Sequence, residues 1–185
     1  MAVSWDDYSD DYEDESLDEV REILRTEPTA VTAPLLSVRD VAELLLERLT
    51  DEQVGASKLQ SLCYLVQGRH LAITAVPAFG DPIYASDHGP FIDALATVGS
   101  DVHRIHGEAR LAEKEQLINT VVTQVAERYG AWSSGQLREL IRNQAPWIHA
   151  WRAAKSHVES AGIIPPALMR DYFMHLASVP YDSVD

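Results

Sequence analysis

The pattern of apolar and polar residues predicts a helical domain that begins at Ser37. From there on, apolar side chains recur at three- and four-residue intervals, the spacing that places them on one face of a helix. Ser37, Ser57 and Ser133 are candidate N-terminal caps, the last with Gln136 as the second half of a capping box. Pro90 and Pro146 stand where a helix-starting proline belongs. Together these signals predict about seven helices, in residues 38–49, 58–73, 90–99, 117–130, 133–142, 146–158 and 165–177.

Signals for β structure are confined to one short stretch, residues 82–86 with the sequence PIYAS. The predicted fold class is therefore all-α: a compact, mainly helical domain with at most a short β segment. We place this domain at residues 37–179, between an acidic N-terminal extension at residues 1–36 and a C-terminal tail at residues 180–185. The length of 185 residues, of which 46% are apolar, suits one domain with a substantial core.

The predicted helix at residues 58–73 is apolar around nearly its whole circumference. Such a pattern is typical of a central helix that is contacted on several sides. Gly68 costs about 1 kcal/mol in a helix interior, which is offset if another backbone approaches closely there. His70 falls on the apolar arc, which favours a hydrogen-bonded core histidine over a ligand. Cys63, the single cysteine, is expected to be a small buried hydrophobe.

The first 36 residues carry most of the excess negative charge. They contain 11 acidic and 2 basic residues, in a chain whose net charge is −14. In residues 1–15 the acids alternate with Trp5, Tyr8 and Tyr12, and their self-repulsion predicts disorder in isolation. A solvated tail is one interpretation. The aromatic residues favour the other, a segment that folds onto a partner.

A short amphipathic helix is predicted after this acidic stretch. Ser16 and Glu19 form a capping box, and Pro28 ends the helix. Leu17, Val20 and Leu24 fall on one stripe. A helix of about ten residues is marginal alone in water. It is therefore expected to pack on its own domain or on another protein.

Charge and composition narrow the class of partner. The chain lacks a basic stripe, which disfavours direct binding to DNA or RNA, and its acidity favours a basic protein partner. The acidic N-terminus is unlike a signal peptide, and no apolar run approaches the about 20 residues needed to cross a bilayer. With one cysteine, no intrachain disulfide is possible, which fits a reducing cytoplasm. We expect a cytoplasmic protein without membrane contact, and leave self-association open.

Histidines and tryptophans are the remaining candidates for chemistry. His103 and His106 have a spacing that can share a metal, with His88 upstream, but the H-E-x-x-H form is missing. We therefore expect no metal, no cofactor and no catalytic residue. Trp147 and Trp151 are spaced to form a pair on one helix face, in which a core role and a partner-contact role both remain open.

Three stretches together resemble the Panacea domain, the SocA-like antitoxin domain of bacterial and phage toxin–antitoxin pairs. Residues 58–72, KLQSLCYLVQGRHLA, are similar to its helix K-L-Q-K-L-x-Y-x-x-Q-G-x-H-L-A. The matching residues are Lys58, Leu59, Gln60, Leu62, Tyr64, Gln67, Gly68, His70, Leu71 and Ala72. Its loop P-L-F-x-x-x-I-x-A-x-x-x-G-P is matched by Phe79, Ile83, Ala85, Gly89 and Pro90. Its later small helix, rich in Ser and Leu and followed by Pro-Trp, is similar to residues 133–147, with Leu137, Pro146 and Trp147 matching. The resemblance covers about residues 37–177, and residues 142–145 and Arg69 depart from it.

The resemblance implies a binding module that is not an enzyme. The implied function is an antitoxin that neutralises a cognate toxin by direct protein contact, or in the SocA type by acting as a proteolytic adaptor. We expect the toxin to have a basic, nucleotide- or nucleic-acid-directed active site that the acidic segment covers. The predicted contact residues are Trp5, Tyr8, Tyr12, Leu17, Val20 and Leu24. The alternatives are a phage- or mobile-element-associated adaptor with the same fold and no dedicated toxin, and a protein whose histidines carry chemistry.

Overall fold

The described part of the chain is a mainly helical domain, as predicted. A computed structural model describes residues 36–49, 54–96, 113–155 and 162–178, all within the compact unit Ala33–Asp185. These residues form seven helices and one two-stranded sheet. The elements are α2 (Val38–Leu46), α3 (Ala56–Thr74), β1 (Tyr84–Ser86), β2 (Gly89–Phe91), α4 (Asp93–Ala96), α5 (Glu113–Tyr129), α6 (Ser134–Arg142), α7 (Ala145–Lys155) and α8 (Pro166–Ser178).

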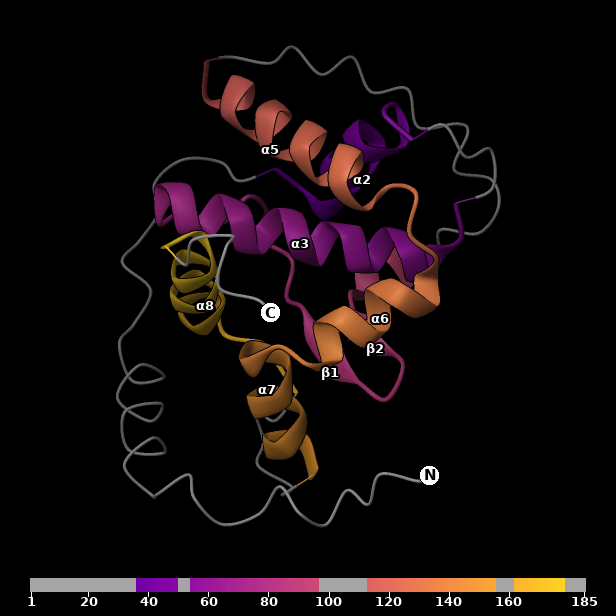
Figure 1. The fold of residues 1–185 in the computed structure, drawn as a ribbon, viewed down its shortest axis with the longest axis vertical. Coiled ribbons are helices and arrows are strands. Elements are labelled where there is room, and N and C mark those ends of the chain that lie inside the picture. The colour runs from indigo at the N-terminus through magenta and orange to yellow at the C-terminus, as the bar shows by residue number, and fades with distance from the viewer. Residues whose placement is uncertain (1–35, 50–53, 97–112, 156–161, 179–185) are drawn as a thin grey trace, which may run out of the picture. The chain divides into compact units, whose positions relative to one another are not determined.

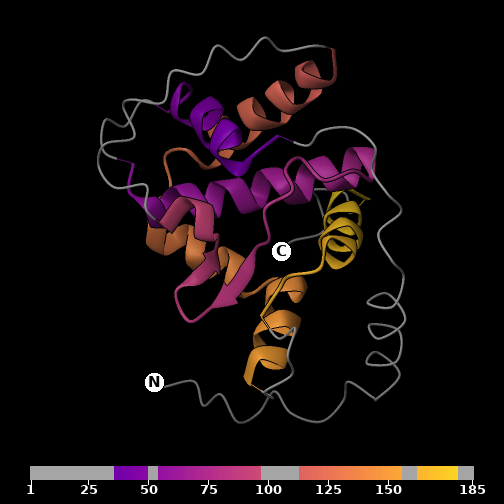
Figure 2. The same cartoon turned by 180° about the vertical axis from the view of Figure 1, so that it is seen from behind.

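Helix α3 is the centre of this domain, as its all-round apolar pattern predicted. Of its 19 residues, 13 are buried, and it contacts α2, α5, α6 and α8. Figure 1 shows α2 and α5 on one side of α3 and α6 and α8 on the other, and Figure 2 shows the same order from behind. A helix covered on both sides has no solvent-facing side, which explains apolar residues around its whole circumference.

Ser37 and Ser133, both predicted as N-terminal caps, each begin a helix with a capping box, of which only the one at Ser133 was predicted. Ser37 Oγ accepts from the backbone N–H of Asp40, whose carboxylate in turn accepts from the backbone N–H of Ser37 at 2.9 Å. Ser133 and Gln136 make the same reciprocal pair at the start of α6. Each box satisfies backbone donors that a helix start leaves without an intrahelical partner.

The predicted β segment is one strand of a short antiparallel hairpin. Strand β1 pairs with β2, with Ala85 opposite Pro90. On its other edge, Ala85 N–H donates to the carbonyl of Gly162 at 2.6 Å, and Ile164 N–H donates to that of Ile83 at 2.7 Å. The hairpin is therefore tied to the segment that enters α8.

Two predicted helix starts are wrong. Helix α3 begins at Ala56 with Gly55 as its cap, so Ser57 lies inside the first turn. The Gly55 carbonyl accepts the first helical hydrogen bonds, so the helix begins before Ser57. Pro90 lies in strand β2, and α4 begins only at Asp93. Proline suits a short edge strand, which leaves one backbone donor unneeded, as well as it suits a helix start.

Two other boundaries differ less. Helix α5 begins at Glu113, four residues before the predicted start at residue 117, and α7 begins at Ala145, with Pro146 as its second residue. Helix α5 ends at Tyr129, where Gly130 N–H donates to the carbonyl of Ala126 at 2.8 Å.

Candidate functional site

The motif helix α3 carries polar side chains that are buried and already bonded. Gln60 Oε1 accepts from the backbone N–H of Ile92 at 2.9 Å, just before α4. The Tyr64 hydroxyl donates to Gln144 Oε1 at 2.9 Å, in the connection between α6 and α7. Gln60 and Tyr64 therefore each hold a segment that lies far away in the sequence.

Gln67 holds the loop that follows α3. Its Oε1 accepts from the backbone N–H groups of Ala78 at 2.8 Å and Phe79 at 3.3 Å. Its Nε2 donates to the carbonyl of Phe79 at 3.1 Å. One side chain therefore satisfies three backbone groups of this loop.

His70 is a hydrogen-bonded core histidine. It is 8% exposed, and its Nδ1 lies 2.8 Å from the carbonyl oxygen of Val76. Because a carbonyl only accepts, Nδ1 carries the proton and donates. Burial lowers the pKa of His70, and the hydrogen bond to Val76 opposes this shift. Burial thus favours the neutral ring, and the hydrogen bond orients it toward the turn that ends α3.

Gly68 marks the place where α8 crosses α3. A Cβ atom at Gly68 would lie 2.5 Å from Cδ2 and 2.6 Å from Cζ of Phe173. The expected close neighbour was another backbone, whereas the atoms that occupy this space belong to an aromatic ring. The ring packs edge-on against Tyr64, with ring centroids 6.1 Å apart.

Most of the remaining motif residues are buried as well, whereas Ala72 is partly buried. Cys63 is fully buried, and burial raises the pKa of its thiol, which disfavours the reactive thiolate. The other buried positions of the motif are Lys58, Leu59, Leu62, Leu71, Phe79, Ile83, Ala85, Gly89, Pro90, Leu137, Pro146 and Trp147. The residues that carry the resemblance therefore lie in the interior of the domain.

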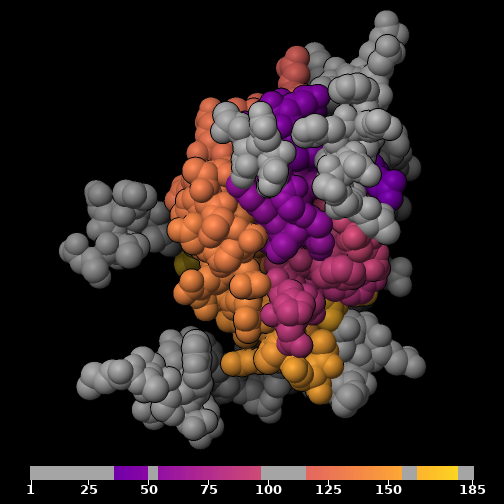
Figure 3. All heavy atoms as spheres, turned by 90° about the vertical axis from the view of Figure 1, so that its right-hand side faces the viewer, coloured from indigo at the N-terminus to yellow at the C-terminus, as the bar shows by residue number. Residues whose placement is uncertain are grey.

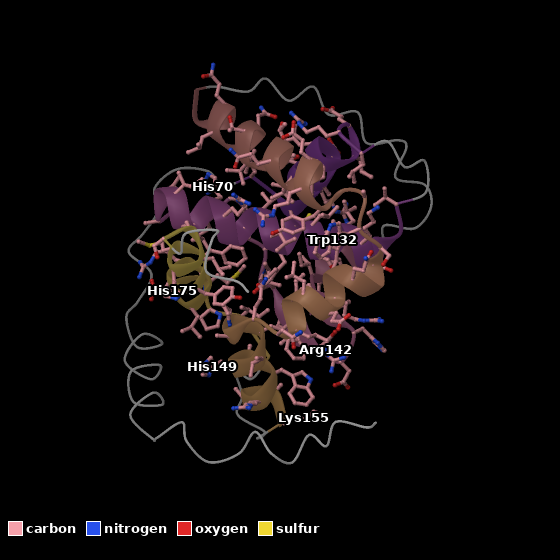
Figure 4. All side chains as sticks on the ribbon, viewed as in Figure 1. His70, Trp132, Arg142, His149, Lys155 and His175 are labelled. Atoms are coloured by element: carbon pink, nitrogen blue, oxygen red, sulfur yellow. The ribbon has the colours of Figure 1, made fainter. Side chains whose placement is uncertain are left out.

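A second group of side chains, which we call the tryptophan cluster, lies where the hairpin meets α6 and α7. It consists of Asp87, Arg142, Trp147, Trp151 and Lys155. The two tryptophan rings are stacked, with centroids 5.6 Å apart and planes 20° apart. Figure 3 shows hairpin, α6 and α7 side by side on one face, and Figure 4 shows Arg142 and Lys155 on the same side of α7.

The tryptophan pair follows from its spacing in the sequence, whereas the charged members of this cluster were not predicted. Arg142 and Lys155 have a detectable signal in the sequence, since Arg142 lies five residues before Trp147 and Lys155 lies four residues after Trp151. Asp87 has none, because it reaches Trp151 from the hairpin turn, 64 residues earlier in the chain.

Several predicted positions fall outside the described residues. They are Trp5, Tyr8, Tyr12, Leu17, Val20, Leu24, His103 and His106. His88 is exposed in the hairpin turn. Across residues 36–49, 54–96, 113–155 and 162–178, no group of three or more His, Cys, Asp or Glu side chains is placed to hold a metal ion. The expectation that His88, His103 and His106 bind no functional ion stays a prediction.

Comparison with known proteins adds no relative. No protein-family model, curated protein or solved structure matches the chain. Among the helices that the structure describes, none is both long and apolar enough to cross a membrane.

Proposed function

We propose that the chain is a protein-binding module, an antitoxin that neutralises a cognate toxin by direct contact in the cytoplasm. The observation that carries this proposal is the use of the polar groups on α3. Gln60, Tyr64, Gln67 and His70 are buried, and each bonds to a connecting segment of the same domain. Polar groups engaged in this way stabilise a scaffold, and a scaffold acts through its surface and its extensions.

The charge of the N-terminal extension indicates the chemistry of the partner. Residues 1–36 carry 11 acidic and 2 basic residues. A toxin that acts on nucleotides or nucleic acids needs a positive surface for phosphates. An acidic segment covers such a surface and competes with the substrate, while its aromatic residues Trp5, Tyr8 and Tyr12 supply anchors.

Deletion of residues 1–27 tests this proposal. The chain and the toxin encoded beside it are co-expressed, and growth is measured with the full chain, the deletion variant and a triple variant in which Leu17, Val20 and Leu24 become Ser. We expect rescue by the full chain and loss of rescue by both variants. Circular dichroism of the purified variants shows whether the helical domain is still folded.

Each outcome of that experiment has a distinct meaning. Rescue by the deletion variant as strong as by the full chain assigns neutralisation to the globular surface. Absence of any toxic neighbour, with growth unaffected by the chain, instead supports an adaptor of the same fold without a dedicated toxin. Loss of helical structure in the triple variant supports the competing interpretation, in which the short helix packs on its own domain.

A further inference from the structure

The tryptophan cluster has an arrangement that its packing alone does not require. Arg142 lies over the Trp147 ring, with its Cζ atom 5.3 Å from the ring centroid. Lys155 lies over the Trp151 ring at 4.7 Å. Each ring thus has one aromatic and one cationic neighbour, and cations placed over indole rings are attracted by the negative face of the ring.

The Asp87 carboxylate contacts both Trp151 and Lys155 at the solvent-exposed edge of this cluster. Trp151 Nε1 donates to Asp87 Oδ1 at 3.0 Å, and Lys155 Nζ lies 3.8 Å from the same oxygen. The hydrogen bond from Trp151 and the charge of Lys155 lower the pKa of Asp87. Its side chain is nevertheless 70% exposed, and that of Lys155 is 60% exposed. Asp87 is therefore a carboxylate bound at the surface, on a two-residue turn.

The cluster lies in a locally basic part of an acidic chain. Residues 133–155 contain four basic residues and one acidic residue, whereas the whole chain has a net charge of −14. Arg138 and Arg142 are exposed on α6, and in the described residues neither forms an ion pair. The cationic groups of the cluster therefore outnumber the single carboxylate that they hold.

One buried donor in the cluster has no acceptor. Trp147 is 3% exposed, and its Nε1 has no hydrogen-bond partner within the described structure. A buried N–H group normally finds an acceptor, and exceptions call for an explanation. An acceptor supplied by a bound partner is such an explanation, since its neighbour Trp151 already uses its own N–H on a carboxylate.

We propose that the tryptophan cluster is a docking site for an acidic segment of a protein partner. A carboxylate of that segment takes the place of Asp87 between Trp151 and Lys155, and further acidic side chains pair with Arg142 and Arg138. Asp87 is then an internal competitor that occupies the site when no partner is bound. This proposal concerns a different part of the chain from the acidic extension, and it goes beyond the function proposed above.

The same observations favour a protein segment over a nucleic acid. Single-stranded nucleic acids bind by stacking bases on aromatic rings. Both rings of the cluster already have an aromatic and a cationic neighbour. A base could stack on either ring only after one of these neighbours had been displaced. The net charge of −14 also repels a long polyanion, whereas a short acidic segment needs only local positive charge.

The test measures binding of the full chain to a fluorescein-labelled glutamate-rich peptide by fluorescence anisotropy at low salt. A labelled oligothymidylate of equal charge is measured beside it. Arg142→Gln and Lys155→Gln each remove one positive charge from the cluster. The matched control Arg128→Gln removes a positive charge that lies over a different ring, that of Tyr129.

A second pair of variants tests the internal competitor. Asp87→Asn removes the carboxylate that occupies the site, and the matched control Asp171→Asn removes one that pairs with Arg170 at 2.8 Å on α8. Circular dichroism establishes that each variant is folded. Each test variant changes the net charge by the same amount and in the same direction as its control. A general effect of net charge therefore appears equally in both.

We expect Asp87→Asn to bind the peptide several-fold more tightly than the unaltered chain. We expect Arg142→Gln and Lys155→Gln to bind it about tenfold more weakly, the scale of one charge-assisted hydrogen bond, with both controls unchanged. The proposal is overturned if no peptide binding is detected, if Asp87→Asn binds no more tightly than Asp171→Asn, or if the oligothymidylate binds more tightly than the peptide.

Discussion

Replacement of Gly68 by Ala is the sharpest test of how α3 and α8 are packed. The added Cβ atom would lie 2.5 Å from Cδ2 and 2.6 Å from Cζ of Phe173, well inside van der Waals contact. The ring has little room to move, because Phe173 is 7% exposed. Its centroid lies 6.1 Å from that of Tyr64 and 5.6 Å from that of Tyr172. The backbone of one helix or the Phe173 ring must therefore shift.

The expected change in the free energy of unfolding is the sum of two opposing effects. Alanine is about 1 kcal/mol more favourable than glycine in a helix interior. Overpacking of a well-packed core costs about 1–3 kcal/mol. Because the clash involves several ring atoms at once, we expect the upper part of that range and a net destabilisation of about 1–2 kcal/mol. Gly68→Leu adds three more carbon atoms and should prevent folding.

Urea denaturation followed by circular dichroism measures this free energy. Gly135→Ala is the matched control, because Gly135 is also helical and its added Cβ would lie 3.8 Å from the Ser133 hydroxyl, an ordinary van der Waals contact. The control should be as stable as the unaltered chain or more stable. In the double variant Gly68→Ala/Phe173→Leu, the smaller side chain should restore part of the loss, with a coupling of about 1 kcal/mol. A Gly68→Ala protein as stable as the Gly135→Ala control would refute the close crossing.

Three further changes address the buried polar side chains of α3. Gln67→Leu removes the partner of three backbone groups and should destabilise the domain by more than the about 1–3 kcal/mol of a single unsatisfied buried group, measured by urea denaturation. Tyr64→Phe leaves Gln144 Oε1 without its donor and should cost about 1–3 kcal/mol, with no change in helix content. The pKa of His70 is lowered in the folded state, so protonation favours the unfolded chain. The free energy of unfolding should therefore be unaffected by His70 above about pH 6.5 and should decrease as the pH falls toward the folded pKa. His70→Leu should reduce that decline, and the remainder should come from His149, whose pKa burial also lowers.

Much of the fold could be predicted because helix caps and apolar stripes depend only on residues that are close together in the sequence. The capping boxes of Ser37 and Ser133 join residues three positions apart, and the helical stripes repeat every three or four residues. The start at Ser57 failed because a glycine two residues earlier serves equally well as a cap. The helix start predicted at Pro90 was wrong because this residue lies in a strand that pairs with the strand of Ala85. No pattern within a few residues distinguishes this hairpin from a helix start.

The parts of the candidate surface that escaped prediction depend on contacts between distant residues. The motif helix showed that polar groups would hold neighbouring segments, but not which segments. The partner of Tyr64 lies 80 residues later, and the partner of Gln60 lies 32 residues later. The tryptophan pair followed from its spacing, whereas the Asp87 carboxylate that joins it comes from a turn whose position is set by the tertiary structure.

The two groups of polar side chains are connected through Gln144. Its side chain accepts the hydrogen bond from Tyr64, and it lies in the chain between Arg142 and Trp147, two members of the tryptophan cluster. The core helix thus fixes the connection that places Arg142 over the Trp147 ring. Tyr64→Phe should therefore weaken binding of the glutamate-rich peptide although Tyr64 itself is fully buried. Gln60→Met, which breaks the bond to the backbone of Ile92 between β2 and α4, is the comparison variant. Equal peptide affinity of both variants, at equal loss of stability, would show that the core does not position this surface.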